Sequence, residues 1–341
     1  MNRVPFGKTG LEIPPIVFGS TNLGNLFHVP SKETKREIVR QWFQHCPPPV
    51  FVDTAGKYGA GLSLEVLGRE LETLGVTTDQ VVINNKLGWR RVPLTGPEPT
   101  FEPGAWLGLE HDAVQDIGYD GIYRCWEEGC KLLGNYRSTL ASVHDPDEYL
   151  AAASSERERE NRLQDILEAY RALAELKASG EVCGIGVGSK DWTVIRELSQ
   201  LVEFDWVMIA NSFTLLQHPP ELLAMIDSLE KDNVGIINSA VYHSGFLVGG
   251  NHFDYRPADN PTLLDWRDRF HKICHEFHLA PADACVQFAM SPPGVTSIAL
   301  SSSNPARVSD NVASVHAEIP REFWAALKQE HLIEAGYPFL A

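Results

Sequence analysis

Short apolar runs alternate with longer amphipathic segments along almost the whole chain. The segment Leu163–Lys177 carries apolar residues at three- and four-residue spacing, and Gly180 is a natural C-terminal stop, so this segment predicts a helix. Eight apolar runs are short enough to be buried strands: Ile16–Phe18, Val50–Val52, Val81–Asn84, Thr139–Val143, Cys183–Val187, Trp206–Ala210, Gly235–Asn238 and Ser297–Leu300. A strand followed by a helix, repeated eight times, predicts a parallel (β/α)8 barrel of the TIM type.

Helical patterns fill the intervals between these runs and continue after the last one. They cover Lys32–Gln44, Leu62–Leu74, Gly121–Leu133, Asn161–Ser179, Trp192–Leu201, Pro220–Lys231, Leu263–Met290 with a break near Pro281, and Pro305–Ser314. Arg3–Phe6 and Leu11–Ile13 predict an N-terminal hairpin that could plug the bottom of the barrel. Arg321–His331 predicts an extra C-terminal helix, followed by a tail that could fold over the mouth. Because no linker or change of composition interrupts the chain, we expect residues 1–341 to form a single domain.

The composition narrows the class of protein. Charged residues make up 22 % and hydrophobic residues 43 %, which is ordinary for a globular enzyme. The net charge of −16 argues against a nucleic-acid partner, although a local basic pocket for a cofactor phosphate is compatible with it. The sequence contains no signal-peptide core and no membrane-spanning stretch, so we predict a cytoplasmic protein. Its six cysteines lack metal-ligand spacing and are expected to be reduced.

Four polar residues lie at or just beyond the ends of predicted strands: Asp53, Tyr58, Lys86 and His144. The strands of a parallel barrel end at one rim, so these side chains are expected to converge there. A phenol can protonate a carbonyl oxygen, or take a proton from an alcohol, if its pKa of ~10 is lowered. We expect the ammonium of Lys86 to lower the pKa of Tyr58, with Asp53 holding Lys86 in place. Each residue alone has a structural explanation, such as a cap or a loop aromatic, but together they favour catalysis.

This set of residues, in this order along the chain, resembles the catalytic tetrad of the aldo-keto reductase family. The resemblance extends from Arg3 to about Ser314. It implies that Tyr58 is the general acid and base, that Lys86 and Asp53 tune it, and that His144 orients the carbonyl. It also implies a nicotinamide cofactor, NAD or NADP, which carries the hydride.

The resemblance also implies residues that hold the nicotinamide. Ser189 and Asn211, after the fifth and sixth strands, occupy places where the family binds the carboxamide. Gly188 takes the other polar position of the fifth strand. Ser239 stands where the family usually stacks an aromatic ring on the nicotinamide. Gly184, Gly186 and Gly188 do not complete a Rossmann-type Gly-x-Gly-x-x-Gly pattern.

The loop after the eighth strand resembles the family's phosphate and adenine site. Its candidate cofactor-binding residues are Ser301, Ser302, Ser303, Arg307, Asp310 and Asn311. Hydroxyl and backbone N–H groups before a helix favour anions. NADP-preferring members commonly place a Lys where this chain has Ser301, which favours NAD, whereas Arg307 keeps NADP open. An N-cap rich in serine is the structural alternative for this loop.

Three runs resemble the branch that oxidises free aldoses at C1, which includes the D-threo-aldose, L-fucose and L-galactose dehydrogenases. They are residues 58–65, 119–124 and 144–147. This resemblance implies a substrate of the L-fucose, D-arabinose or L-galactose type and a lactone product. In the long segment from Leu87 to about Asp120, Trp89 and Tyr119 are candidate substrate-binding residues, because such loops usually set specificity.

Several alternatives stay open. Within the family these are a pyridoxal dehydrogenase and a general aldehyde or ketone reductase. From other classes come a regulatory barrel that binds nucleotide without catalysis, and a metal-dependent hydrolase using Asp53, His144, Asp145 and Asp147. The hydrolase lacks the paired His ligands that would support it, so we predict no metal. We expect a small-molecule partner and a monomer or small homo-oligomer.

Overall fold

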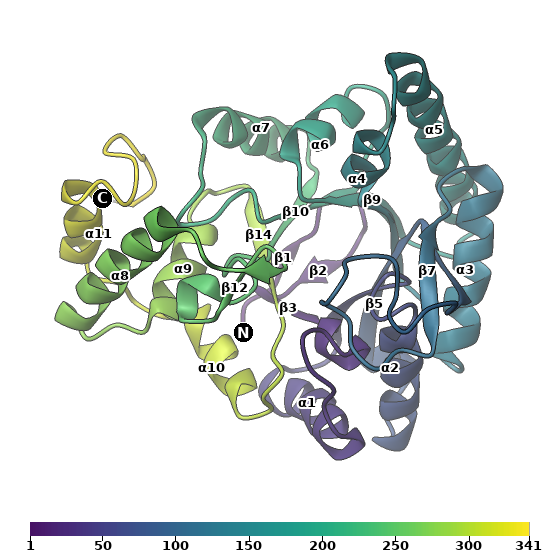
Figure 1. Cartoon of the computed structure of the whole chain (residues 1–341), viewed down its shortest axis with the longest axis horizontal. Helices are drawn as coiled ribbons and strands as arrows, with labels where there is room; N and C mark the ends of the chain where they lie inside the picture. Colours follow the sequence, from purple (N-terminus) through teal and green to yellow (C-terminus); the bar gives the residue numbers. More distant parts are fainter. Residues whose placement is uncertain (341) are drawn as a thin grey trace.

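The computed structural model describes residues 1–340 and contains a closed barrel of eight parallel strands (Figure 1). Around the barrel they are β3 Ile16–Gly19, β4 Val50–Ala55, β5 Val81–Leu87, β8 Leu140–His144, β9 Gly184–Ser189, β10 Trp206–Ala210, β11 Gly235–Ser239 and β14 Val295–Leu300. β14 pairs with β3 and closes the ring. The predicted fold is therefore confirmed. Several strands continue past their apolar run, because polar residues such as Asp53, Lys86 and His144 also join the ladder.

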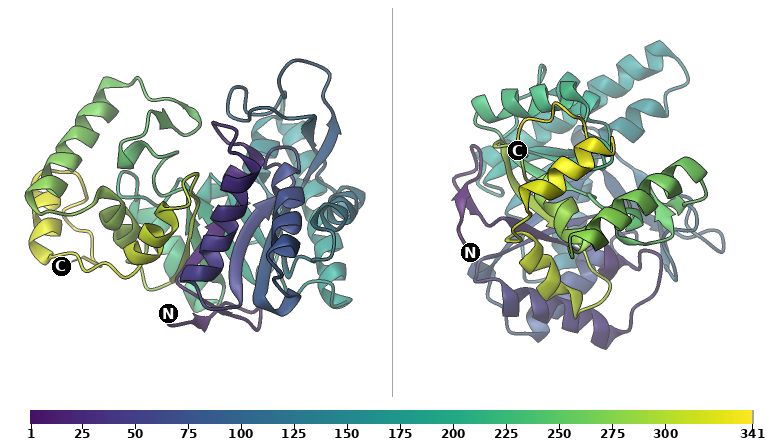
Figure 2. Two further views of the ribbon diagram at one scale, coloured as in Figure 1. Left: turned by 90° about the horizontal axis from the view of Figure 1, so that it is seen from below. Right: turned by 90° about the vertical axis from the view of Figure 1, so that its left-hand side faces the viewer.

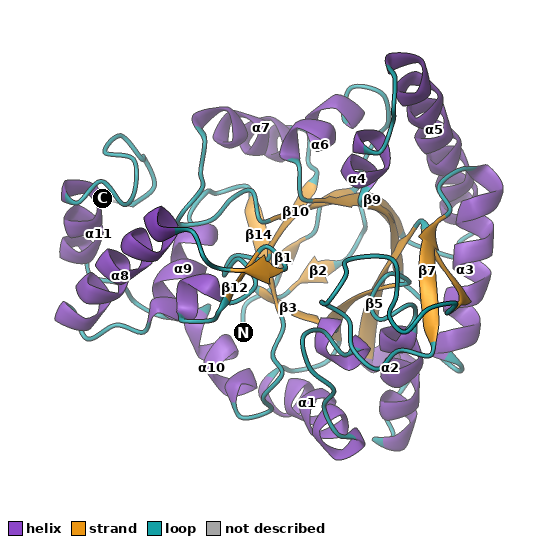
Figure 3. Ribbon diagram, in the orientation of Figure 1, coloured by secondary structure: helices purple, strands orange, loops and turns teal. Residues whose placement is uncertain are grey.

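Helices surround this ring (Figure 3). Those that follow the strands are α1 Lys32–His45, α2 Leu62–Thr73, α3 Tyr119–Leu133, α5 Glu156–Ala178, α6 Trp192–Leu198, α7 Pro220–Lys231, α9 Pro281–Ala289 and α10 Arg307–Ser314. Additional helices are α4 Pro146–Ala151, α8 Pro261–Glu276 and α11 Arg321–Gln329, with 3-10 turns η1 Thr21–Gly24, η2 Thr78–Gln80 and η3 Phe246–Val248. The Ser31 side chain caps α1 by accepting from the backbone N–H of Thr34, which satisfies a donor that the helix itself cannot.

The N-terminal hairpin closes the bottom of the barrel, as predicted. Its strands are β1 Val4–Pro5 and β2 Glu12–Ile13, which pair antiparallel at the end of the barrel opposite the long loops (Figure 2). Phe6 is fully buried, and its ring centroid lies 6.1 Å from that of Trp206 on β10. Gly7 has φ +51°, and a Cβ there would lie 2.0 Å from the carbonyl oxygen of Asp205. Only glycine therefore lets the hairpin approach the ends of the strands so closely.

The long segment after β5 contains structure that the sequence analysis did not predict. β6 Trp89–Pro93 and β7 His111–Gln115 form an antiparallel ribbon, and a loop spanning 94–110 connects them. A second ribbon, β12 His252–Phe253 with β13 Arg256–Pro257, follows η3. Both ribbons lie on the side where the barrel strands end (Figure 2).

The C-terminal tail does not fold over the mouth of the barrel, so that expectation is wrong. The ring of Tyr337 stacks on Phe288 of α9 at 4.7 Å, and its hydroxyl lies 2.5 Å from the hydroxyl of Ser291. Lys328 of α11 donates to the carbonyl oxygen of Tyr337. The aromatic contact with α9 therefore holds the tail against the outer helices. Within residues 1–340, no helix is long and apolar enough to span a bilayer.

Candidate active site

Three strands and one turn bring the predicted tetrad together. Asp53 lies in β4, Lys86 in β5 and His144 at the end of β8, while Tyr58 lies in the turn between β4 and α2. Register pairs Asp53 with Asn84 and Ala55 with Lys86, so Asp53 and Lys86 lie two residues apart along neighbouring strands. Asp53, Lys86 and His144 are each at most 6 % exposed. All four side chains line one cavity.

Lys86 and Asp53 form a tight buried ion pair. The ammonium of Lys86 lies 2.5 Å from both carboxylate oxygens of Asp53, and Asn84 donates to Oδ1 of Asp53 at 2.8 Å. The stem of Lys86 passes over Gly188, where a Cβ would lie 2.8 Å from Cδ of Lys86. Glycine at this place in β9 leaves room for the stem of Lys86.

Tyr58 lies against this ion pair and against His144. Its hydroxyl donates to Oδ2 of Asp53 at 3.4 Å, and the ammonium of Lys86 lies 4.6 Å from the centre of its ring. The imidazole of His144 meets the Tyr58 ring edge-on at 5.6 Å. Trp106, from the loop 94–110, stacks on the other side at 5.9 Å. The phenol is therefore held between a charged pair, an imidazole and an indole.

The expectation that Lys86 lowers the pKa of Tyr58 is wrong for this structure. Burial raises the pKa of Tyr58 well above its ordinary value of 10.0, and the negative charge of Asp53 raises it further. The ammonium of Lys86 contacts both oxygens of Asp53 and lies over the face of the tyrosine ring. The carboxylate of Asp53 largely compensates the charge of the Lys86 ammonium, so little of that charge is left to stabilise a phenolate at Tyr58. Tyr58 is therefore a protonated phenol.

His144 is a neutral imidazole. Burial lowers its pKa well below the ordinary value of 6.5, and the positive charges of Lys86 and Lys57 also oppose its protonation, although Asp145 favours it. Its Nε2 lies 3.5 Å from Oδ1 of Asp145, and Nδ1 is buried with no partner among residues 1–340. A neutral ring keeps both a donor and an acceptor, so it can orient a hydroxyl or a carbonyl oxygen.

A second charged cluster adjoins the tetrad, and sequence reasoning named only Asp145 of it, as a candidate residue of a metal-dependent hydrolase. The ammonium of Lys57 lies 2.7 Å from Asp145, 2.8 Å from Glu148 and 2.9 Å from Glu102. Lys190 pairs with Glu148 at 2.7 Å and with Glu102 at 3.1 Å. Burial alone would raise the pKa of Glu102, but the two ammonium groups hold it below its ordinary value. The only available signals were a lysine directly before Tyr58 and another directly after Ser189.

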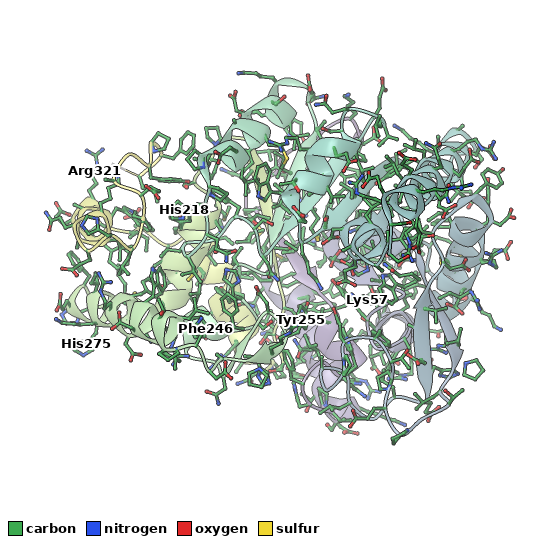
Figure 4. All side chains as sticks on the ribbon, turned by 45° about the horizontal axis from the view of Figure 1, so that its top comes forward. Lys57, His218, Phe246, Tyr255, His275 and Arg321 are labelled. Atoms are coloured by element: carbon green, nitrogen blue, oxygen red, sulfur yellow. The ribbon has the colours of Figure 1, made fainter. Side chains whose placement is uncertain are left out.

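Aromatic residues complete the wall around this cluster. Tyr255, from the turn between β12 and β13, has its ring 4.8 Å from the ammonium of Lys190 (Lys57 and Tyr255 are labelled in Figure 4). Phe27 lies beside Tyr255 at 6.0 Å. The indole N–H of Trp106 donates to Glu102 at 2.7 Å. The space above Tyr58 is therefore bounded by flat rings with carboxylate, ammonium and hydroxyl groups between them.

The same cavity, of about 940 Å³, continues away from Tyr58 toward α10. Most of the predicted cofactor-binding residues line it: Ser189, Ser239, Ser301, Ser302, Ser303, Arg307, Asp310 and Asn311. The hydroxyl of Ser301 is fixed by Asn22 at 2.8 Å and by Thr21 at 2.9 Å. A cavity of this size, with a reactive polar end and a helix N-terminus at the other end, fits an extended dinucleotide.

Three predicted site residues do not line the cavity. Trp89 lies beneath it in β6, where the ammonium of Lys57 covers its ring at 4.6 Å. Tyr119 begins α3 on the outside of the barrel, where its hydroxyl donates to Glu175 of α5 at 2.6 Å. Asn211, at φ +57°, turns the chain just after β10, and its buried Oδ1 has no partner among residues 1–340. In the same range, no group of three or more His, Cys, Asp or Glu side chains could hold a metal ion.

Comparison with known proteins identifies the family. Residues 15–331 match the model of the Aldo/keto reductase family. The chain belongs to this family. Pyridoxal 4-dehydrogenase of Microbacterium luteolum is 29 % identical over 339 residues, which is 96 % of each chain. D-threo-aldose 1-dehydrogenase of a Pseudomonas species is 28 % identical over 341 residues, covering 95 % of this chain and 96 % of the relative.

A solved structure of the same family supports the fold. The holo form of aldo-keto reductase AKR11C1 from Bacillus halodurans superposes with a TM-score of 0.71. The superposition covers 98 % of this chain and 97 % of that one, at 18 % sequence identity. Together with the family and its dehydrogenase relatives, the complete barrel makes this aldo-keto reductase an NAD(P)-dependent oxidoreductase.

Replacing Tyr58 with Phe removes the phenolic hydroxyl while keeping the ring between Trp106 and His144. We expect turnover to fall by about 10²–10⁴-fold, which is the usual contribution of a positioned acid or base. The affinity for NAD(P)H, followed by quenching of protein fluorescence, should stay unchanged. Turnover close to that of the natural enzyme would remove Tyr58 from the mechanism.

The raised pKa of Tyr58 sets the direction of the pH dependence. A proton donor works below its pKa, so the rate of carbonyl reduction should not fall through loss of this proton below about pH 10. A proton acceptor must first lose its proton, so kcat/KM for alcohol oxidation should keep rising up to about pH 10. Stopped-flow or steady-state profiles in both directions measure this. An oxidation profile that levels off near neutral pH would indicate a lowered pKa instead.

Proposed function

We propose that this enzyme oxidises the C1 hydroxyl of a free aldose, of the L-fucose, D-arabinose or L-galactose type, to the lactone. The observation that carries the proposal is the wall above Tyr58, where Glu102, Lys190 and Tyr255 offer hydrogen-bonding groups beside the flat ring of Trp106. A polyhydroxylated ring can form further hydrogen bonds with these groups beside their ion pairs, whereas a plain aliphatic chain can form none. The similarity to a D-threo-aldose 1-dehydrogenase over the whole chain supports the same class.

The proposed chemistry assigns one task to each member of the tetrad. Tyr58 exchanges the proton of the reacting oxygen, and His144 orients that oxygen as a neutral ring. Asp53 and Lys86 fix the phenol through the 3.4 Å hydrogen bond and the contact with the ring face. A nicotinamide cofactor, when bound, supplies the hydride acceptor. Since the phenol is protonated in this structure, reduction can start directly, and oxidation requires its proton to leave first.

For the cofactor we propose NADP. Arg307 is exposed at the start of α10, lines the cavity, and makes no ion pair with any of residues 1–340, so its guanidinium is available for a phosphate. Ser301 cannot supply a positive charge, and its hydroxyl is already shared with Thr21 and Asn22. Ser302, Ser303, Asp310 and Asn311 are the residues that we propose contact the phosphates and the adenine.

Pyridoxal is the second candidate substrate. Trp106 and Tyr255 provide aromatic faces for a flat heterocycle, and Glu102 provides a carboxylate that could pair with a protonated ring nitrogen. The pyridoxal 4-dehydrogenase of Microbacterium luteolum is a relative of the same length. Pyridoxal also carries an aldehyde next to a hydroxymethyl group, so it can close into a cyclic hemiacetal as an aldose does.

A substrate panel tests the proposal. L-fucose, D-arabinose, L-galactose, pyridoxal and simple aldehydes and ketones are each assayed with NADP(H) and then NAD(H), following the absorbance of the reduced nicotinamide. We expect kcat/KM for at least one aldose to exceed that for pyridoxal by about tenfold, equivalent to ~1.4 kcal/mol. Preference for pyridoxal would select the second candidate. Reduction of simple carbonyls without oxidation of any aldose would make the enzyme a general reductase.

Replacing Arg307 with Ala tests the cofactor. We expect the Kd for NADP(H) to rise by about tenfold or more, because the guanidinium no longer pairs with the phosphate. The Kd for NAD(H) should change by less than about threefold. Arg321, which starts α11 away from the cavity, gives the matched Arg321→Ala control. Equal losses for both cofactors would show that Arg307 does not read the extra phosphate.

A further inference from the structure

Lys57 occupies an unusual position for a lysine. It directly precedes Tyr58, yet its side chain is only 2 % exposed and its ammonium faces inward. Three carboxylates lie within 3.0 Å of this ammonium, and the ring of Trp89 covers it at 4.6 Å. Lysines are almost never so fully buried unless they are paired, and here the pairing is complete.

The three carboxylates come from three different parts of the active site. Asp145 directly follows His144, so its 2.7 Å contact joins the segment of the phenol to the segment of the imidazole. Glu102 belongs to the loop 94–110, which also carries Trp106 into the cavity. Glu148 lies in α4, and joins Lys57 and Lys190 into one network. One ammonium therefore connects the turn of Tyr58 with the end of β8, with α4 and with the loop 94–110.

Charge and burial make this connection rigid. Burial alone would lower the pKa of Lys57, but Asp145, Glu102 and Glu148 together raise it well above its ordinary value, so the group stays charged. Attraction between charges is strong where water is excluded, and the network fixes the distances between its members. An uncharged side chain at position 57 would remove the ammonium that contacts buried Asp145 and would leave Lys190 to compensate Glu102 and Glu148.

We propose that Lys57 is a positioning residue that holds Tyr58 in register with His144 through Asp145, and holds the loop 94–110 over the cavity through Glu102. The first half of the proposal rests on the proposed roles of Tyr58 and His144, and the second half does not. We call the contact of Lys57 with Asp145 the first arm and its contact with Glu102 the second arm. The two arms can be tested separately, because each carboxylate contacts Lys57 independently.

Each arm has its own variant. Lys57→Met removes both arms with an unbranched side chain of similar length, Asp145→Asn weakens the first and Glu102→Gln the second. Lys231→Met is the matched control, since Lys231 forms an exposed pair with Asp227 on α7, and both partners are more than 60 % exposed. Two measurements are made on each protein: kcat and KM with whichever substrate the natural enzyme turns over, and hydrogen exchange of peptides covering residues 94–110 without substrate.

The expected pattern differs between the variants. Lys57→Met should lower kcat by about 10²-fold, as small misplacements of catalytic groups do, and speed exchange in the loop 94–110 by about tenfold. Asp145→Asn should lower kcat with the exchange of the loop unchanged. Glu102→Gln should speed exchange of the loop 94–110 by about tenfold, and this exchange without substrate is the readout for the second arm, because KM also reports any contact between Glu102 and the substrate. Lys231→Met should change neither quantity.

Several results would overturn the proposal. If Lys57→Met lowers thermal stability but leaves kcat and loop exchange unchanged, the cluster only stabilises the fold. If Lys57→Met does not fold, Asp145→Asn and Glu102→Gln decide, and identical effects of the two would contradict separate arms. Failure of the proposed substrate is distinguishable, because any substrate serves for kcat and hydrogen exchange needs none. Loss of Tyr58 from the mechanism would appear in Tyr58→Phe, not in the loop.

Discussion

The site depends on one constraint, which is that parallel strands in a closed ring all end at the same rim. β4, β5 and β8 are neighbours in this ring, so Asp53, Lys86 and His144 meet although they are far apart in sequence. The ion pair between Asp53 and Lys86 then stabilises the rim from within, because both groups are buried and neither has another charged partner as close. Tyr58 packs against that pair, and the cavity wall packs against Tyr58.

This constraint also decides which parts of the molecule could be predicted from sequence. The barrel strands are short apolar runs, and a residue at the end of such a run lies at the rim where all the strands end. The tetrad and the serine-rich loop before α10 were therefore located correctly in space. Trp89 and Tyr119 were located incorrectly. The direction of the Trp89 side chain depends on the pairing of β6 with β7, and that of Tyr119 depends on where α3 begins. No local sequence pattern predicts either feature.

The wall of the cavity was beyond prediction for the same reason. Glu102 and Tyr255 reach the cavity from irregular segments, and both have positive φ angles, at +44° and +69°. Such conformations are stabilised by tertiary contacts, so the direction of these side chains follows from the finished fold. Lys57 and Lys190 lie next to predicted residues, but their partners are supplied by distant segments. The pairing of these buried lysines with carboxylates therefore becomes visible only in the folded structure.

The N-terminal hairpin closes the lower end of the barrel, and this limits how small molecules reach the cavity. Phe6 and Ile13 fill the base of the ring with side chains, so the part of the chain that the structure describes closes this end of the barrel. Everything that reaches Tyr58 must arrive and depart on the side of the two ribbons. A dinucleotide and a small molecule that occupy this one cavity would lie side by side, so the order in which they leave would depend on which one lies deeper.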